Sequence, residues 1–350
     1  MGSFSPWCWG RRPDREAGCS PPAATCWFGL VGSVVWFRRT GPESFEPVVL
    51  ADSLGRVADV QAADLTGDGY TDLLVAVFGW MENGGLLVLE NTGEATPSFV
   101  PHVLDARPGF SDVRAADLDA DGRLDLVALI SQEFQQVMVY RAEADGYRAE
   151  TVWQAPNPDW GFSGLEVADF TGNGLPDVIV TNGDNLDLTV AKPYHGVGLL
   201  ENLGDGRFEY RHLTSMYGAH RAVPLDLTGE GRMGLLVSAY LPPSVAARAP
   251  GPAEALLWLE RVGPTQLVRR VLASDDVVYM TVAAGDVTGN GRPDIALGLM
   301  DLGVVDPQQA YRGQPLTAWV SLWRNAGVEG GAAGAPEGEV IDWRAGPAGR

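Results

Sequence analysis

The chain has 350 residues and a formal net charge of −20 at pH 7, with 45 Asp and Glu against 25 Lys and Arg. This acidity argues against binding nucleic acid or an anionic membrane surface, because both need clustered basic side chains. No apolar run reaches the roughly 18 residues that a membrane span needs. The length suits one large all-β domain or two ordinary domains, and the 44 glycines and 24 prolines predict many turns and few long helices.

Residues 1–32 are rich in Trp, Arg, Cys and Pro, show no period, and are interpreted as an irregular N-terminal segment. All three cysteines, Cys8, Cys19 and Cys26, lie here, so no disulfide or thiol chemistry is expected in the rest of the chain. Residues 23–37 follow three arginines and could be a poor signal peptide. We favour a misassigned or truncated start, because residues 33–37 also fit a strand.

One nonapeptide recurs five times and predicts the architecture. Its copies begin at Asp64, Asp117, Asp169, Asp226 and Asp286, so successive copies are 53, 52, 57 and 60 residues apart. They read DLTGDGYTD, DLDADGRLD, DFTGNGLPD, DLTGEGRMG and DVTGNGRPD. A period of this length suits one four-stranded blade of a β-propeller.

Four strands are predicted in each period. A short strand precedes each nonapeptide, and an unbroken apolar run such as LLVAVF follows it, which indicates a strand buried on both faces. A third strand often ends in Asn or Gly, as in LLVLENTG, and a weaker fourth strand follows, as in FVPHVL. Residues 33–50 match strands three and four of a blade whose first two strands are missing upstream.

The predicted fold class is therefore all-β, a β-propeller of about six four-stranded blades, or seven in a truncated ancestor. Residues 33–327 are assigned to the propeller, and closure could pair its N-terminal strands with the last blade. Residues 328–350 form a Gly/Ala/Pro-rich tail, in which residues 339–343 could serve as an edge strand.

The nonapeptide places oxygen-bearing side chains at positions 1, 3, 5 and 9, with glycine at position 6. Calcium takes 6–8 oxygen ligands, and a tight loop can bring that many together only if such side chains alternate along it. Position 12, where an EF-hand needs Glu, is apolar in every copy, so a β-hairpin metal loop is predicted instead. The alternative is a Gly-rich hairpin closed by Asx hydrogen bonds without metal.

The pattern D-x-[DNT]-x-[DN]-G-x-x-D between two strands resembles the FG-GAP/VCBS repeats of integrin α-subunit propellers and of many bacterial extracellular proteins. The resemblance covers residues 33–325. It implies calcium-binding loops, an extracellular or periplasmic location, and a role in adhesion or ligand binding, with enzymes in the minority. The implied calcium ligands are Asp64, Thr66, Asp68, Asp72, Asp117, Asp119, Asp121, Asp125, Asp169, Thr171, Asn173, Asp177, Asp286, Thr288, Asn290 and Asp294.

The copies differ in expected affinity for calcium. The second copy has carboxylates at all four ligand positions and is expected to bind most tightly, while threonine at position 3 lowers the charge of the first, third and fifth. The fourth copy has Gly234 at position 9 and the longer Glu230 at position 5. It is expected to bind weakly or not at all.

No motif specifies a reaction, since HExxH and GxSxG are both absent. Three long insertions, residues 182–196, 240–254 and 300–315, follow second strands and should emerge on the face opposite the nonapeptides. Function often resides on such loops, so a protein or carbohydrate ligand is expected there. The candidate residues are Asp184, Lys192, Tyr194, His195 and His220. The alternative is that Tyr194 and His195 only fix the loop to the propeller.

The sequence thus predicts a calcium-binding, extracellular or periplasmic propeller that binds or adheres to a protein or glycan. Two alternatives stay open. One is a propeller enzyme, a glycan lyase or hydrolase, that uses the long-loop face, and the other is a structural domain of a larger protein.

Overall fold

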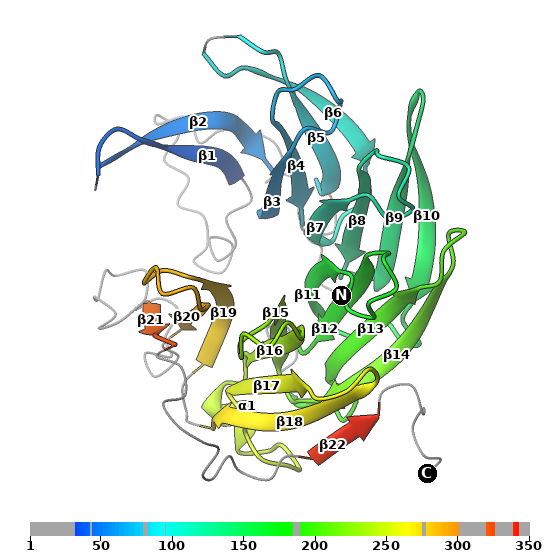
Figure 1. Cartoon of the computed structure of the whole chain (residues 1–350). Coiled ribbons are helices and arrows are strands. Elements are labelled where there is room, and N and C mark those ends of the chain that lie inside the picture. The colour runs from blue at the N-terminus through cyan, green and yellow to red at the C-terminus, as the bar shows by residue number, and fades with distance from the viewer. Residues whose placement is uncertain are drawn as a thin grey trace, which may run out of the picture.

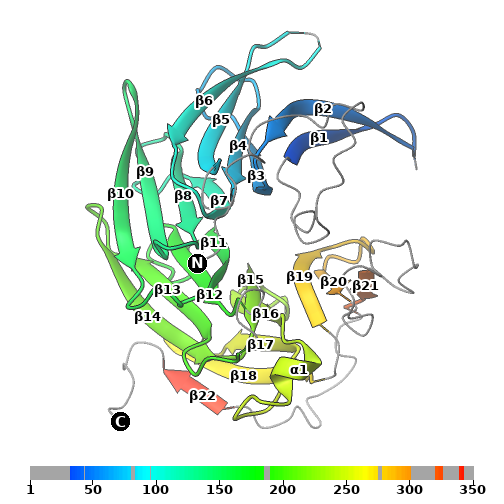
Figure 2. The same ribbon diagram turned by 180° about the vertical axis from the view of Figure 1, so that it is seen from behind.

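The computed structural model describes residues 32–42, 44–79, 83–94, 96–184, 190–274, 278–300, 320–325 and 339–342. Antiparallel sheets follow one another around a common centre as the blades of a propeller (Figures 1 and 2). Within these ranges the one helix is the short α1 (Pro243–Ala246). The prediction of an all-β propeller with four-stranded blades is confirmed.

The first three blades have four strands each, in chain order. Blade 1 contains β3 (Val57–Ala63), β4 (Asp72–Val77), β5 (Gly85–Asn91) and β6 (Phe99–Asp105). Blade 2 contains β7 (Phe110–Ala116), β8 (Asp125–Ile130), β9 (Gln136–Glu143) and β10 (Gly146–Gln154). Blade 3 contains β11 (Phe162–Ala168), β12 (Asp177–Asn182), β13 (Gly196–Asn202) and β14 (Phe208–Ser215).

The remaining sheets depart from this plan. Blade 4 has β15 (Ala219–Leu225), β16 (Gly234–Ala239), β17 (Leu256–Arg261), β18 (Gln266–Ala273) and a fifth strand, β22 (Glu339–Asp342), beside β18. Blade 5 has β19 (Val278–Gly285), β20 (Asp294–Met300) and β21 (Val320–Trp323). A two-stranded sheet of β1 (Gly32–Arg39) and β2 (Phe45–Leu54) precedes blade 1.

The predicted number of blades is wrong, because the described residues form five blades rather than six or seven. Within them β1 and β2 pair with each other and not with β21, so the expected pairing between the N-terminal strands and the last blade does not occur there. Strand β22 is an edge strand, as expected for this segment, but it lies on blade 4. The assigned boundaries at residues 32 and 327 stay predictions.

The second strand forms the centre of each complete blade. In β4, β8, β12 and β16 all six residues are buried, as their unbroken apolar runs predict. Alternate side chains face the two neighbouring sheets, because successive residues of a strand point to opposite faces. Leu74 and Ala76 of β4 pack with Phe110 of blade 2, whereas Leu73 and Val75 pack with Val34 of β1.

Each nonapeptide joins the first and second strands of its blade, so all five lie at the same end of the propeller. The glycine at position 6 has φ between 77° and 89° in all five copies, a left-handed conformation that favours glycine. Position 4 has the same handedness and is glycine in four copies, but it is Ala120, with φ 61°, in blade 2.

Candidate metal centre

The aspartate at position 1 organises each nonapeptide through backbone hydrogen bonds. In blade 1, Asp64 Oδ1 accepts from the N–H of Gly67 at 2.7 Å, and Oδ2 accepts from the N–H of Gly69 at 2.9 Å. The bond to the glycine at position 6 recurs at Asp117, Asp169, Asp226 and Asp286. This is the Asx closure expected of a Gly-rich hairpin, and it holds the carboxylate in one orientation at the loop.

The aspartate at position 9 is buried and joins the loop to the third strand. Asp72 Oδ2 accepts from the N–H groups of Leu65 and Thr66, at 2.9 and 3.1 Å. Its Oδ1 accepts from the N–H of Asn91 on β5 at 2.8 Å. The bond to the third-strand end is also 2.8 Å long at Asp125, Asp177 and Asp294. The metal pattern alone did not reveal this structural role.

In the loop of blade 2 three carboxylates come together. Oxygen atoms of Asp117, Asp119 and Asp121 all lie within 4.8 Å of one another, so one calcium ion with 2.3–2.6 Å bonds could contact all three. Asp119 and Asp121 are exposed, and the hydrogen bond from Arg123 lowers the pKa of the Asp121 carboxyl. Nowhere else in the described ranges do three acidic, His or Cys side chains meet in this way.

The fourth carboxylate predicted for this loop, Asp125, pairs with Arg141 of β9. Arg141 Nη1 donates to Asp125 Oδ2 at 2.9 Å, and both residues are buried. The other terminal nitrogen, Nη2, is buried without a hydrogen-bond partner. The equivalent position, just before the residue that donates to the position 9 aspartate, is Glu90 in blade 1 and Glu201 in blade 3. An arginine where the neighbouring blades have a glutamate is the sequence feature that could have indicated the pairing of Arg141 with Asp125. The spacing of residues within the loop could not indicate it.

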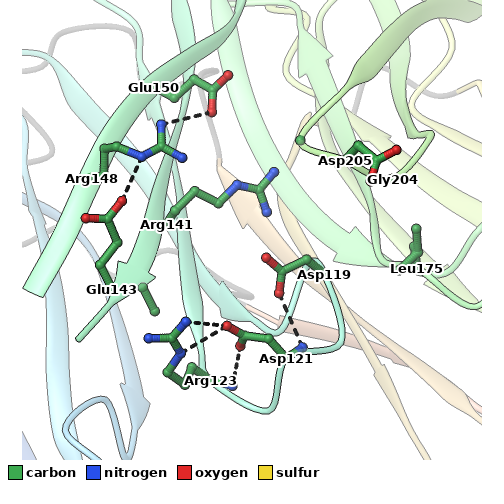
Figure 3. A pocket seen from close by; sticks show the side chains of 12 residues that line it. Asp119, Asp121, Arg123, Arg141, Glu143, Arg148, Glu150, Leu175, Gly204 and Asp205 are labelled. Atoms are coloured by element: carbon green, nitrogen blue, oxygen red, sulfur yellow. Dashed lines mark hydrogen bonds and ion pairs between the residues drawn. The ribbon is translucent and has the colours of Figure 1, made fainter.

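A hollow of about 740 Å³ opens beside this loop and is lined by residues of blades 2 and 3 (Figure 3). Arg141 lines it together with Asp119 and with Asp205 of the turn after β13. Nearby, Arg148 pairs with Glu143 at 2.8 Å. The lining contains three arginines and five carboxylates, so the hollow suits a polar partner better than an apolar one.

The other predicted loops are compact turns with fewer carboxylates. At position 5 of blades 3 and 5, Asn173 and Asn290 donate their amides to the carbonyls of Asn202 and Asn325, at 2.8 and 2.9 Å. At position 3, the backbone N–H groups of Thr66, Thr171 and Thr288 donate to the position 9 aspartate of their own loops. At position 5 of blade 1, Asp68 accepts from the N–H of Tyr70. These residues stay predicted ligands.

On the opposite face, most of the residues predicted to bind a ligand contact the scaffold. The Tyr194 ring stacks on Trp160 at 5.0 Å, and its hydroxyl donates to the carbonyl of Asp159 at 2.9 Å. Lys192 Nζ donates to the same carbonyl at 2.5 Å. His195 is buried, and burial lowers its pKa to about 4.

His220 packs edge-on against Tyr240, and burial lowers its pKa to about 4 as well. The Asp184 N–H donates to the carbonyl of Gly161. These contacts suit the alternative role of fixing the long loop, and the assignment of the five residues to a ligand site stays a prediction. Residues 185–189 and 301–315 of the insertions lie outside the described residues.

Comparison with known families agrees with the repeat. Residues 64–128, from the first nonapeptide into β8, match the model of the FG-GAP-like repeat. No curated protein matches the chain. Across the part of the chain that the structure describes, no helix is long and apolar enough to cross a membrane.

Proposed function

The chain is a β-propeller of FG-GAP/VCBS-type repeats, and from this premise we propose that it binds calcium through its nonapeptide loops and acts as a binding or adhesion module for a protein or glycan. One observation carries the calcium proposal, the approach of three carboxylates within 4.8 Å in blade 2. Hard oxygen donors on a rigid turn are the ligands that calcium prefers.

The site in blade 2 would use Asp117, Asp119 and Asp121, with the carbonyl of Arg123 at position 7. Asp125 differs from the others, because Arg141 already neutralises its carboxylate. The loop therefore offers three carboxylates for an ion rather than the four that its sequence contains, and one of them, Asp121, is paired with the exposed Arg123. It has three carboxylates at positions 1, 3 and 5, against two at these positions in blade 1 and one each in blades 3 and 5, where position 3 is a threonine.

Calorimetric titration of the full chain with calcium tests the proposal. Asp119→Asn should remove or weaken one site at least tenfold, because it takes away one of three carboxylates that meet at the ion. The control is Glu230→Gln in blade 4, where the loop lacks an aspartate at position 9, and it should leave the titration unchanged. Equal titrations of the wild type and D119N would contradict the assignment.

The proposed location is extracellular or periplasmic. Exposed loops with few charges bind calcium at about 10⁻⁴–10⁻³ M in extracellular modules, a range that is useful only where calcium is abundant. Detection of the native protein in a periplasmic or secreted fraction supports this location, and exclusive recovery from the cytosol refutes it.

The proposed ligand is a protein or glycan on the long-loop face, with Asp184, Lys192, Tyr194, His195 and His220 as candidates. A glycan and protein array, probed with and without calcium, would identify the ligand class. Tyr194→Phe keeps the ring that stacks on Trp160 and removes the hydroxyl. Loss of array binding at an unchanged melting temperature supports a ligand role for Tyr194, whereas retained binding with a lower melting temperature shows that Tyr194 only fixes the loop.

A further inference from the structure

We propose that the free edge of β1 is a docking surface for a β-hairpin from another polypeptide, one that carries the pattern of the first two strands of a blade. Strands β1 and β2 occupy the places of strands three and four. Arg39 faces Phe45 at the end of their hairpin, just as Asn91 faces Phe99 in blade 1. In blade 1 the third strand also pairs with the second, whereas β1 pairs with β2 alone among the described residues.

The side chains of β1 are those of a buried third strand, yet residues 35–39 are exposed and only Val34 of this strand is buried. Trp36 and Phe37 are 40% and 64% exposed. Arg261 of blade 4 is equivalent to Arg39, since each lies at the end of a third strand. Trp258 and Leu259 therefore match Trp36 and Phe37, and they are only 4% and 0% exposed. An apolar strand of this kind, open on one edge, marks an interaction surface.

A repeated contact joins the third-strand end of one blade to the nonapeptide of the blade before it. The carbonyl of the residue at position 2 of one nonapeptide accepts a hydrogen bond from the third-strand end of the next blade. The donors are Asn202 to Leu118 at 2.8 Å, Arg261 to Phe170 at 2.5 Å, and Asn325 to Leu227 at 3.0 Å. The next residue in this series is Arg39, because its strand β1 lies after blade 5 and before blade 1 around the propeller (Figure 1).

The same third-strand residue also binds the nonapeptide of its own blade. Asn91 Nδ2 donates to the position 8 carbonyl of Thr71 at 3.0 Å, and its backbone N–H donates to the position 9 carboxylate of Asp72 at 2.8 Å. Arg39 occupies this position in β1. Among the described residues, β1 is not preceded by a first strand, a nonapeptide and a second strand of its own blade. Four of the five nonapeptides in the described chain carry an aspartate at position 9, and an occupant with that residue would place its carboxylate beside the backbone N–H of Arg39. The side chains at this end of β1 are already engaged in the hairpin, because Arg38 pairs with Glu46 at 2.6 Å and Arg39 donates to the carbonyls of Gly41 and Pro42.

The geometry around the centre also leaves a place for the first strand of such a hairpin. First strands contact one another in the series β3, β7, β11, β15 and β19. A hairpin on β1 would put its first strand between β19 and β3 and continue this interface. On the blade 5 side, Val320 and Leu322 of β21 are exposed, at 65% and 42%, and offer the apolar face that the hairpin's second strand would cover.

Residues 57–77, which comprise β3, the first nonapeptide and β4, can serve as the hairpin in a binding test of the proposal. Fused to a soluble carrier and labelled, this hairpin should bind the full chain one to one in an anisotropy titration. A carrier with Asp72→Asn should bind at least tenfold more weakly, because the amide keeps only one of the two oxygens that would accept the loop N–H groups and the N–H of Arg39. In the full chain, Phe37→Ser should weaken binding tenfold, whereas Val100→Ser, at another exposed apolar residue on an outer strand, should not.

Sedimentation of the full chain alone completes the test. A monomer that binds the hairpin, with new hydrogen-exchange protection over residues 33–39, supports the proposal. A dimer that the hairpin does not dissociate would mean that a second copy covers the edge, and it overturns the proposed occupant. Absence of saturable binding, or equal binding by the D72N hairpin, overturns it too.

Discussion

Blades 2 and 3 are neighbouring copies of one repeat, yet one matching pair of residues on their third and fourth strands has opposite charge. In blade 3, Arg211 of β14 bridges Glu201 and Glu209 at 2.8 Å each. The register places Arg141 opposite Arg148 in blade 2, as it places Glu201 opposite Glu209 in blade 3. Two arginines face each other there, and Arg141 turns inward to the position 9 aspartate of its own loop. One charge inversion at a strand edge thus alters the chemistry of a loop, so copies of a repeat should not be assigned equal sites.

The largest expected effect comes from the buried pair that blade 3 lacks. Arg141→Ala leaves the Asp125 carboxylate buried without its cation, which costs about 3 kcal/mol of unfolding free energy. Denaturant unfolding measures the loss. Arg148→Ala, which breaks an exposed pair with Glu143, should cost less than about 1 kcal/mol, and equal losses in the two variants would show that the Arg141 pair is energetically ordinary.

A second difference lies on the first strands, where blade 2 has Asp112 and blade 3 has Gly164 at the matching position. Burial raises the pKa of Asp112 to about 6, although the paired Arg221 opposes this shift. The folded protein therefore holds a proton that the unfolded chain releases near pH 4. Stability from this group should fall as the pH rises from about 4 to 6, by about 2–3 kcal/mol at 1.36 kcal/mol per pKa unit.

Unfolding free energies measured from pH 4 to 7 check this. Asp112→Asn should flatten the profile over that window, while Glu209→Gln, on the outer edge of blade 3, should leave its shape unchanged. A profile that keeps its slope in D112N would assign the pH dependence to other groups.

The calcium comparison can be sharpened by giving blade 3 the carboxylates of blade 2. Thr171→Asp combined with Asn173→Asp should tighten the calcium site of blade 3 at least tenfold in a calorimetric titration. At a hundredfold excess of calcium over Kd, that site would add about 2.7 kcal/mol to the unfolding free energy. If the double variant titrates like the wild type, the charge at positions 3 and 5 does not limit calcium binding by the loop of blade 3.

The smallest expected effect concerns position 4 of the same two loops. Ala120 has φ 61° where blade 3 has Gly172 with φ 76°. Ala120→Gly should stabilise the chain by about 0.5–1 kcal/mol, because a Cβ in the left-handed region costs more than glycine loses in the unfolded chain. Gly172→Ala should destabilise it by a similar amount. Thermal unfolding in the presence of EDTA separates this backbone effect from calcium, and opposite signs would refute it.

The part of the fold that depends on local pattern could be predicted from the sequence. The nonapeptide turns and the buried second strands follow from residues within about one strand of each other. The number of blades could not be predicted, because it depends on which strands distant in sequence pair with β1, β2 and β22. At the candidate site, the approach of Asp117, Asp119 and Asp121 follows from their spacing. The pairing of Asp125 with Arg141 does not, since it depends on the side-chain direction of a residue two strands away.

Strand β22 has a mechanical consequence for the propeller. It pairs with β18 over four residues, from Gln266 opposite Asp342 to Arg269 opposite Glu339, and so closes a loop of chain that contains blade 5. A pulling force applied beyond Asp342 would reach blade 4 through this pairing before it reached β21. Blade 5 would carry no tension until β18 and β22 separated. The pairing of β18 with β22 would therefore bear the load first and protect the three-stranded blade from unfolding under force.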